Sequence, residues 1–164
     1  MEWFEELPPS CPPLNAVDCK GIYYRVSHEK PAESHDIFSQ RLLAPDKQVK
    51  GEEIDECIVR AVSVFSELND AKNLLKLPKF KKANIAELHL QEQDGKIKKT
   101  FKKSRYSWWK SKSFNVNNVD VPSKDRLYLY PECAEGKTPS STLLDCVLYS
   151  LWAFIGLFTS KGLS

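Results

Sequence analysis

The sequence predicts an α+β fold, with a single domain around a mostly antiparallel sheet, a strand-turn-helix unit and an apolar C-terminal helix. Two observations support this prediction. Segments that alternate like strands outnumber segments with helical periodicity, and 164 residues are enough for one domain with a hydrophobic core. We divide the chain into a proline-rich N-terminal arm (1–20), an α+β domain (21–137) and a C-terminal hydrophobic helix (138–164).

The N-terminal arm contains four of the ten prolines, in two Pro-Pro pairs. Proline lacks the N–H group that a sheet requires, so we expect an extended arm on the surface of the domain. Gly21–Val26 follows and is rich in β-branched and aromatic residues, which predicts the first strand. Alternation along this strand gives two faces, with Ile22, Tyr24 and Val26 on one and Tyr23, Arg25 and Ser27 on the other.

The clearest strand-turn-helix unit lies in the middle of the chain. Ile58–Phe65 has the composition of a strand, and residues 66–77 carry apolar side chains at helical spacing. Ser66 is placed to cap this helix and Pro78 to end it. Upstream, Pro31–Leu43 predicts either a short helix or an ordered loop.

Further strands are expected after the helix. Ile85–Leu90 alternates apolar and polar residues, as a half-buried strand does. The Asp94-Gly95 pair predicts a hairpin turn, with Lys96–Phe101 as the returning strand. Residues 119–122 and 125–131 are predicted as two more short strands.

The C-terminal segment is almost continuously apolar. Ser141–Ser160 just reaches the roughly 17–25 residues that a helix needs to cross a bilayer. Small and polar residues fall along one face of this helix, so a helix that packs on the sheet or on a partner would have the same pattern. A membrane tail anchor and a packed helix therefore both stay open.

Composition favours a soluble domain. The net charge of +2 and pI near 8.2 are too mild to indicate nucleic-acid binding by themselves, although basic residues gather between Lys76 and Lys112.

The five cysteines form no C-x-x-C pair and the histidines lack metal-ligand spacing, so we expect no metal site, and free thiols in a reducing compartment. The N-terminus lacks signal-peptide features, which predicts a cytoplasmic protein, membrane-associated only if 141–160 inserts.

No strong catalytic motif is present in the sequence, and its six glycines are too scattered for a phosphate-binding loop. Arg25 is a candidate because a guanidinium in a cleft can bind phosphate or carboxylate through two parallel hydrogen bonds. The alternative is a surface arginine that packs along a tyrosine ring. His28 and His35 can each act as an acid, a base or a ligand contact, or serve as ordinary polar residues.

Residues 100–115, "TFKKSRYSWWKSKSFN", interleave aromatic and basic side chains. Such a segment can stack bases and neutralise phosphates. On a strand, however, each face would carry a ring and cations, and exposing both tryptophans would be costly. We therefore expect Trp108 or Trp109 in the core. A core strand with a lysine rim, the wall of a small-molecule or NAD pocket, and a nucleic-acid surface stay open as interpretations.

The order of segments in 21–109 resembles a group of small uncharacterised prokaryotic proteins and, loosely, the ADP-ribosyltransferase layout. An early strand carries Tyr24-Arg25, Ser63–Phe65 leads into a helix, and the alternating strand Ile85–Leu90 follows. In that family the early Arg or His and the strand Ser hold NAD. The resemblance therefore implies an NAD-type pocket, with NAD as a substrate rather than a required cofactor. Its candidate residues are Arg25, Ser63, Tyr24 and Trp108.

The same family usually carries a catalytic Glu in an E-x-E or Q-x-E motif on a late strand. Here Glu92 stands in "LQEQ" and Glu87 in a plain alternating strand, so an active and a degenerate protein are equally compatible with the resemblance. Three functional hypotheses follow. They are an ADP-ribosyltransferase-like protein that uses NAD, a module for RNA or single-stranded DNA, and a tail-anchored membrane interaction protein.

Overall fold

The computed structural model describes residues 1–46, 55–101 and 104–123. The chain divides into two units, Met1–Lys124 and Asp125–Ser164, and the described residues belong to the first. The predicted strand at 125–131, the C-terminal helix at 138–164 and its candidate membrane segment 141–160 lie outside the described residues. None of the helices in the described part is long and apolar enough to cross a membrane.

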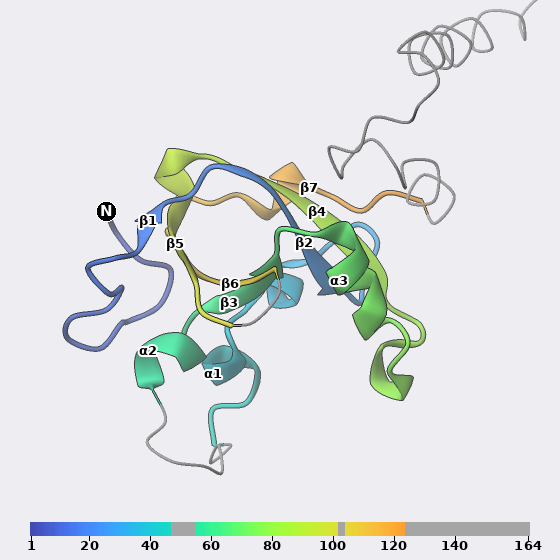
Figure 1. Ribbon diagram of the computed structural model, residues 1–164, viewed down its shortest axis with the longest axis horizontal. Coiled ribbons are helices and arrows are strands. Elements are labelled where there is room, and N and C mark those ends of the chain that lie inside the picture. Colours follow the sequence, from blue (N-terminus) through green and yellow to red (C-terminus); the bar gives the residue numbers. More distant parts are fainter. Residues whose placement is uncertain (47–54, 102–103, 124–164) are drawn as a thin grey trace, which may run out of the picture. The chain divides into compact units, whose positions relative to one another are not determined.

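A seven-stranded sheet, antiparallel at every pairing, organises the described unit (Figure 1). The strands in spatial order are β1 (Val17–Asp18), β5 (Gly95–Lys99), β6 (Arg105–Lys110), β3 (Val62–Phe65), β2 (Gly21–Ser27), β4 (Asn84–Leu90) and β7 (Val119–Asp120). The described α-helices are α1 (Gln40–Leu43), α2 (Glu56–Val59) and α3 (Leu68–Leu74). Short 3₁₀ turns are η1 (Ser34–Ile37), η2 (Pro78–Phe80), η3 (Glu92–Asp94) and η4 (Val116–Asn118). A mostly antiparallel sheet with few helices is thus confirmed.

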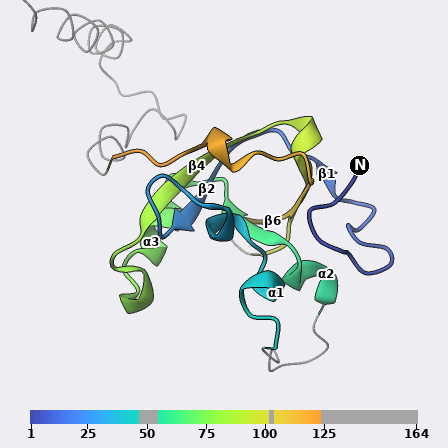
Figure 2. The ribbon, with the colours of Figure 1, turned by 180° about the vertical axis from the view of Figure 1, so that it is seen from behind.

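The sheet opens between two of its central strands. β2 pairs with β4 along all seven of its residues, from Gly21↔Leu90 to Ser27↔Asn84. With β3, in contrast, β2 pairs only at Tyr24↔Phe65. We call this opening the strand split. It separates β2, β4 and β7 from β3, β6, β5 and β1, and the ribbon curves so that the strands surround a common interior (Figures 1 and 2).

The interior is filled by apolar side chains from alternate positions of four strands and from two connecting segments. Their alternation on β4 confirms the half-buried strand predicted there, since Leu88 and Leu90 both lie in the core. The buried cluster consists of Cys19, Ile37, Val62, Val64, Leu88, Leu90, Ile97 and Trp108. Tyr23, Tyr106, Phe114, Val116 and Val119 pack against it, which closes the interior on the side of β7.

Both tryptophans of β6 are buried, although neighbours on a strand point to opposite faces. The indole Nε1 of Trp108 donates to the Asp94 carbonyl oxygen at 3.1 Å. The indole of Trp109 donates to the Cys57 carbonyl oxygen at 2.9 Å. The aromatic and basic segment is therefore a core strand, and Lys110 is buried with it.

The predicted hairpin between Ile85–Leu90 and Lys96–Phe101 is wrong, because β4 and β5 are not neighbours in the sheet. The chain makes a corner instead. Gly95 has a φ of +133°, and a Cβ there would lie 2.0 Å from the Trp109 carbonyl oxygen, so only glycine fits this approach of two backbones. The corner carries the chain across to β6, with which β5 pairs from Gly95 to Lys99.

Two boundaries around β3 also differ from the prediction. The run Ile58–Phe65 is a strand only from Val62, because Asp55 caps α2 by accepting a hydrogen bond from the Cys57 amide at 3.0 Å. Ser66 does not cap the next helix. Its amide instead donates to the Ser104 carbonyl oxygen at 2.9 Å, which extends the β3–β6 pairing, and α3 begins at Leu68.

The N-terminal arm contains two turns, in which the Cys11 amide donates to the Pro8 carbonyl oxygen and the Ala16 amide donates to the Pro13 carbonyl oxygen. Near Phe4 the arm is attached to β6, beyond the start of β3. The Phe4 amide donates to the Lys110 carbonyl oxygen at 3.0 Å, and the Lys112 amide donates to the Glu2 carbonyl oxygen at 2.9 Å. The expectation of free thiols is wrong for two cysteines, since Cys11 of the arm forms a disulfide with Cys57 of α2. Their Cα atoms stand 5.6 Å apart, a normal disulfide distance that only the folded arm produces.

Candidate functional site at the strand split

Arg25 of β2 lies at the strand split and binds backbone on both sides of it. Its Nη1 donates to the Ser63 carbonyl oxygen of β3 at 2.7 Å, and its Nη2 donates to the Phe38 carbonyl oxygen at 2.9 Å. Its Nε donates to the Asp36 carbonyl oxygen. Ser63 lies where β2 and β3 no longer pair. Arg25 therefore supplies a hydrogen bond that the backbone of β2 does not make.

The environment of Arg25 disfavours its charge without removing it. Burial lowers the pKa of its guanidinium to about 10, the nearby Asp36 carboxylate opposes this shift, and Arg105 adds to it. Arg25 therefore remains a cation at neutral pH, in a place where a second cation stands close by.

The second cation, Arg105 of β6, binds the side chain of the same serine. The pairing Tyr24↔Phe65 places the Ser63 side chain on the face of Tyr24, opposite to Arg25. On that face the Nη2 of Arg105 donates to the Ser63 hydroxyl at 2.8 Å. Two guanidinium groups thus bind Ser63, one at its carbonyl oxygen and the other at its hydroxyl.

Arg105 has an unusual polar environment. Its guanidinium lies 4.4 Å from the centre of the Phe101 ring, and burial lowers its pKa. Its Nε is buried and has no hydrogen-bond partner among the described residues. Within the same part of the chain, no carboxylate forms an ion pair with it. Among the described residues, the Nε of Arg105 therefore has no acceptor and its charge has no carboxylate partner.

Hydroxyl groups continue the polar face beside Arg105. Ser107 is the direct cross-strand neighbour of Ser63. Its hydroxyl forms a 2.7 Å hydrogen bond with the hydroxyl of Thr100. Cross-strand neighbours share a face of an antiparallel sheet, so Ser63, Ser107 and Arg105 present two hydroxyls and a guanidinium on one side. Chemically, this set can bind an anion that carries several oxygens.

The other two candidate residues take different positions. Tyr24 shares the face of Ser63, and burial raises the pKa of its phenol, with further contributions from Glu87 and Glu67. Trp108 is completely buried in the interior, where its edge contacts the ring of Phe114. The structure therefore brings Arg25 and Ser63 into contact, and places Trp108 away from any exposed surface.

Sequence reasoning did not select Arg105. It stands among other basic residues in a segment of mixed charge, and nothing local distinguishes it from them. Its role depends on the register of β6 against β3, which pairs Ser63 with Ser107 and Phe65 with Arg105. This register brings Arg105 to Ser63, from which it is separated by 42 positions in the sequence. Only a correct strand pairing would have identified it.

The carboxylates considered from the sequence have partners elsewhere. Glu87 contacts His89 at 2.7 Å, and Glu92 contacts Lys20 at 3.8 Å. Asp36 lies closer to the split. Burial opposes its ionisation, but hydrogen bonds from the His28, Glu29 and Glu33 amides and the Ser27 hydroxyl outweigh burial and hold its pKa below the usual value.

The two histidines lie on the loop that Asp36 organises. His28 packs against the Phe80 ring at 5.9 Å between ring centres, and His35 lies 3.5 Å from the Glu33 carboxylate. No described contact connects either ring with the Ser63 hydroxyl.

A third cation stabilises the same loop from the side of the N-terminal arm. The ammonium of Lys110 donates to the Ile37 carbonyl oxygen at 3.3 Å and lies 3.5 Å from the centre of the Phe4 ring. Together with Arg25, it binds the three consecutive carbonyl groups of residues 36–38. Burial lowers the pKa of Lys110 to about 8, while Glu5 acts in the opposite direction.

We expect Lys110 to make stability depend on pH in a defined range. Between pH of about 8 and 10.5, the folded state binds fewer protons at this residue than the unfolded state. The contribution of Lys110 to the free energy of unfolding should therefore rise with pH across this range. Denaturant unfolding of the wild type and Lys110→Met at several pH values measures it, because Glu5, Arg25 and the tyrosines are common to both proteins. A constant difference between the two would contradict the buried position of Lys110.

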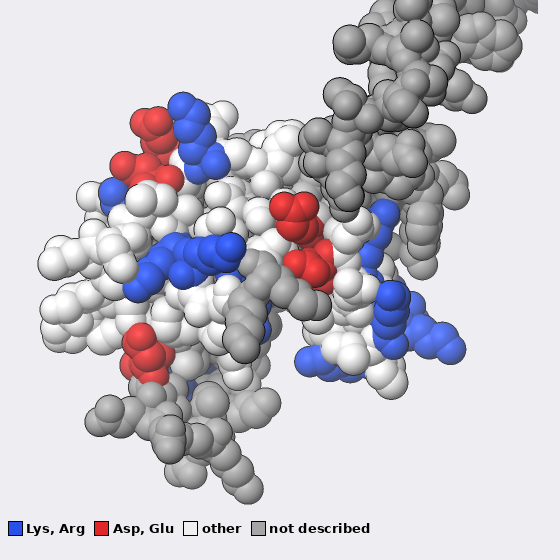
Figure 3. Space-filling model, viewed as in Figure 1, with Lys and Arg blue, Asp and Glu red and all other residues white. Residues whose placement is uncertain are grey.

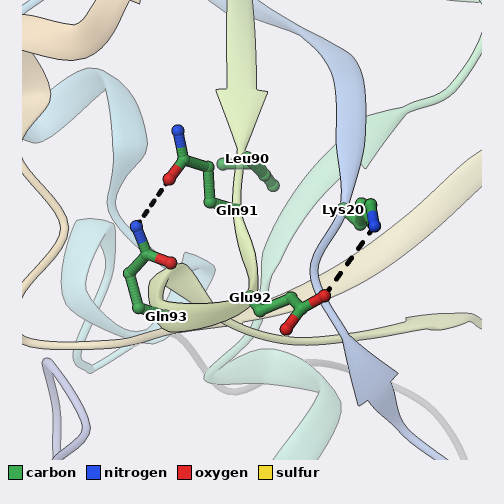
Figure 4. A pocket seen from close by; sticks show the side chains of 5 residues that line it. All are labelled: Lys20, Leu90, Gln91, Glu92 and Gln93. Atoms are coloured by element: carbon green, nitrogen blue, oxygen red, sulfur yellow. Dashed lines mark hydrogen bonds and ion pairs between the residues drawn. The ribbon is translucent and has the colours of Figure 1, made fainter.

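A shallow pocket of about 390 Å³ lies near the corner between β4 and β5 (Figure 4). Four of the five residues that line it have polar side chains, and these contact one another. Lys20 pairs with Glu92 at 3.8 Å, and Gln93 donates to Gln91 at 2.7 Å. Leu90 completes the lining and pairs with Gly21, four residues along β2 from Arg25. The pocket offers no concentration of positive charge.

On the face shown in Figure 3, lysine and arginine side chains form separate groups with acidic side chains between some of them. Among the described residues visible on this face, the basic side chains form no continuous surface. Comparisons of the chain with protein families, with curated proteins and with solved structures find no match.

Proposed function

We propose that this protein binds NAD, or a related ligand with an ADP-ribose diphosphate, at the strand split, as an ADP-ribosyltransferase-like protein. One observation carries the proposal. Ser63 is contacted by two guanidinium groups, from Arg25 at its carbonyl oxygen and from Arg105 at its hydroxyl. Arg25 and Ser63 are the two positions that the resemblance assigns to NAD, and they meet although 38 residues separate them.

The donor set fits a diphosphate. Phosphate oxygens accept strong, charge-assisted hydrogen bonds from guanidinium groups, often two at a time. The buried Nε of Arg105 has no acceptor among the described residues, and a phosphate oxygen would provide one. The Ser63 hydroxyl accepts from Arg105, which leaves its own hydrogen available to donate to the same ligand.

The proposal concerns binding rather than transfer. β6, which carries Arg105, contains no carboxylate from Arg105 to Lys110. Glu87 and Glu92 are held by His89 and Lys20. The residues at the split therefore support recognition of the anionic part of the ligand, and we assign them no bond-breaking step.

Thermal unfolding with added ligand tests the proposal. Millimolar NAD and ADP-ribose should raise the melting temperature, whereas nicotinamide and adenosine, which lack the diphosphate, should not. At a ligand concentration of 100 times Kd, the stabilisation is about 2.7 kcal/mol, enough to shift melting by several degrees. Titration calorimetry supplies the affinity. Absence of both a melting shift and binding heat at millimolar NAD would refute the proposal.

Lys20→Gln is the matched control, because it removes a cation that lines the shallow pocket. We expect its melting shift with NAD to equal that of the wild type. Loss of the shift in this variant would place the ligand in the pocket rather than at the strand split. High salt should weaken binding only moderately, whereas a nucleic-acid surface would lose affinity steeply with salt.

A further inference from the structure

The two arginines that contact Ser63 differ in how many of their donors are already used. Arg25 binds the Asp36, Phe38 and Ser63 carbonyl groups, so each of its three nitrogens already has an acceptor. Only two of its five N–H groups, one on each Nη, are unused by described residues, and Arg25 lies on the face opposite to the Ser63 hydroxyl. Moving its guanidinium toward a phosphate on that face would break at least one of the three bonds and leave a partly buried carbonyl at the split without its donor, which is costly.

In Arg105, by contrast, most of the N–H donors have no acceptor among the described residues. Only its Nη2 bonds to another described residue, the Ser63 hydroxyl, while its Nε is buried without an acceptor in the part of the chain that the structure describes. A buried donor without a partner is destabilising, and native structures usually satisfy such a group with a protein, water or ligand atom. The missing partner is therefore an acceptor that approaches Arg105.

The surroundings of Arg105 favour an anionic acceptor. The Phe101 ring, 44% exposed, packs against the guanidinium and restricts its plane. No described carboxylate neutralises the charge, and Arg25 adds positive potential close by. The Ser63 hydroxyl lies on the same face, whereas the neighbouring Ser107 is buried and bonds to Thr100. An oxyanion with several acceptor atoms would satisfy the Nε, the charge and the Ser63 hydroxyl together.

We propose that Arg105, with the hydroxyl of Ser63, makes the direct contact with the ligand's phosphate, and that Arg25 is a positioning residue that holds the strand split in place. The inference rests on the proposed function for the identity of the ligand, and assigns its diphosphate to the face that carries Tyr24 and Ser63. It predicts that replacing Arg105 weakens ligand binding, whereas replacing Arg25 lowers the stability of the fold.

Titration calorimetry of Arg105→Gln with NAD and with inorganic pyrophosphate tests the assignment. The wild type should bind both, and the variant should bind each about 10- to 100-fold more weakly, the effect of losing a charge-assisted hydrogen bond. Lys99→Gln is the matched control. It removes the same charge from an exposed residue of β5 whose partner, Tyr106, faces the interior side of the sheet. Its affinity should stay within twofold of the wild type.

A spectroscopic readout separates direct contact from structural support. In a ¹⁵N-labelled wild-type protein, the Nε–H resonance of Arg105 should shift on addition of NAD or pyrophosphate, while that of Arg25 should not. Arg105→Lys, which keeps the charge but lacks the Nε, identifies the resonance and should recover part of the lost affinity. It also provides a folded variant if Arg105→Gln does not fold.

The outcomes distinguish the inference from the proposed function. Wild-type affinity for NAD in Arg105→Gln, or a shift of the Arg25 resonance alone, would overturn the inference and leave NAD binding intact. Binding of pyrophosphate that depends on Arg105, without binding of NAD, would support the inference and refute the proposed function. Failure of the wild type to bind either ligand would overturn both.

Discussion

Replacing Arg25 with methionine should lower the free energy of unfolding by about 3–5 kcal/mol, because it leaves several partly buried carbonyl groups without donors. Methionine keeps an unbranched stem of similar length, so the loss concerns hydrogen bonds more than packing. The three carbonyls belong to β3 and to the loop around η1, so the variant loosens the connection between the two parts of the sheet. Denaturant unfolding followed by circular dichroism measures the change.

Arg25→Lys provides the matched comparison for this experiment. A lysine keeps the positive charge but offers a single nitrogen, which cannot reach three carbonyls in different directions. Its stability should therefore fall between that of the wild type and of Arg25→Met. If Arg25→Met stays within about 1 kcal/mol of the wild type, the carbonyls at the split find other donors, and the structural role assigned to Arg25 is wrong.

Loss of the Cys11–Cys57 disulfide should have a similarly large effect. The bond closes a loop with a sequence separation of 46. The loop-entropy relation for such a closure gives a stabilisation of about 4 kcal/mol. Reduction also frees the arm next to α2, where the Cys57 carbonyl oxygen accepts the hydrogen bond of Trp109. Unfolding of the oxidised wild type and of Cys57→Ser, both followed by tryptophan fluorescence, measures the difference.

Reducing agent provides the control for the disulfide. It should destabilise the wild type to the level of Cys57→Ser and leave Cys57→Ser itself unchanged, because the other described cysteine, Cys19, is a buried free thiol. Equal stability of the oxidised and reduced wild type would contradict the expected contribution. In the cytoplasm, the location expected from the sequence, both thiols would be reduced, and the arm would be held by its hydrogen bonds, the Lys112–Glu2 ion pair and the contacts of the Phe4 ring.

Patterns confined to one segment predicted the structure best. The alternation in Gly21–Val26 and Ile85–Leu90 identified β2 and β4, because each strand exposes one face to the interior. The Asp94-Gly95 pair also marks the start of β5, but the two strands on either side of it do not pair with each other as a hairpin would require. Turn chemistry fixes the local backbone, whereas the pairing of β5 with β6 depends on the burial of Ile97 against Trp108.

The candidate site was also predictable only in part, because local sequence patterns do not show which distant strands pair. The resemblance selected Arg25 and Ser63, which meet in the structure. The importance of Arg105 arises from a register between distant strands, and alternation indicates which face a residue occupies but not which residue stands opposite. Trp108 shows that composition alone does not predict where an aromatic side chain lies. An aromatic residue beside cations suits a pocket wall and a core position equally well, and its complete burial places it in the core.

The position of the N-terminal arm has a consequence for self-association. β6 continues beyond the start of β3, and there Lys110 and Lys112 would present unpaired backbone groups to solvent. An exposed strand edge of this kind is a template on which a second chain can add a strand. The hydrogen bonds from Phe4 and to Glu2 occupy this edge with residues of the N-terminal arm. We therefore expect that removal of these residues would leave the edge unpaired and favour edge-to-edge association of two chains.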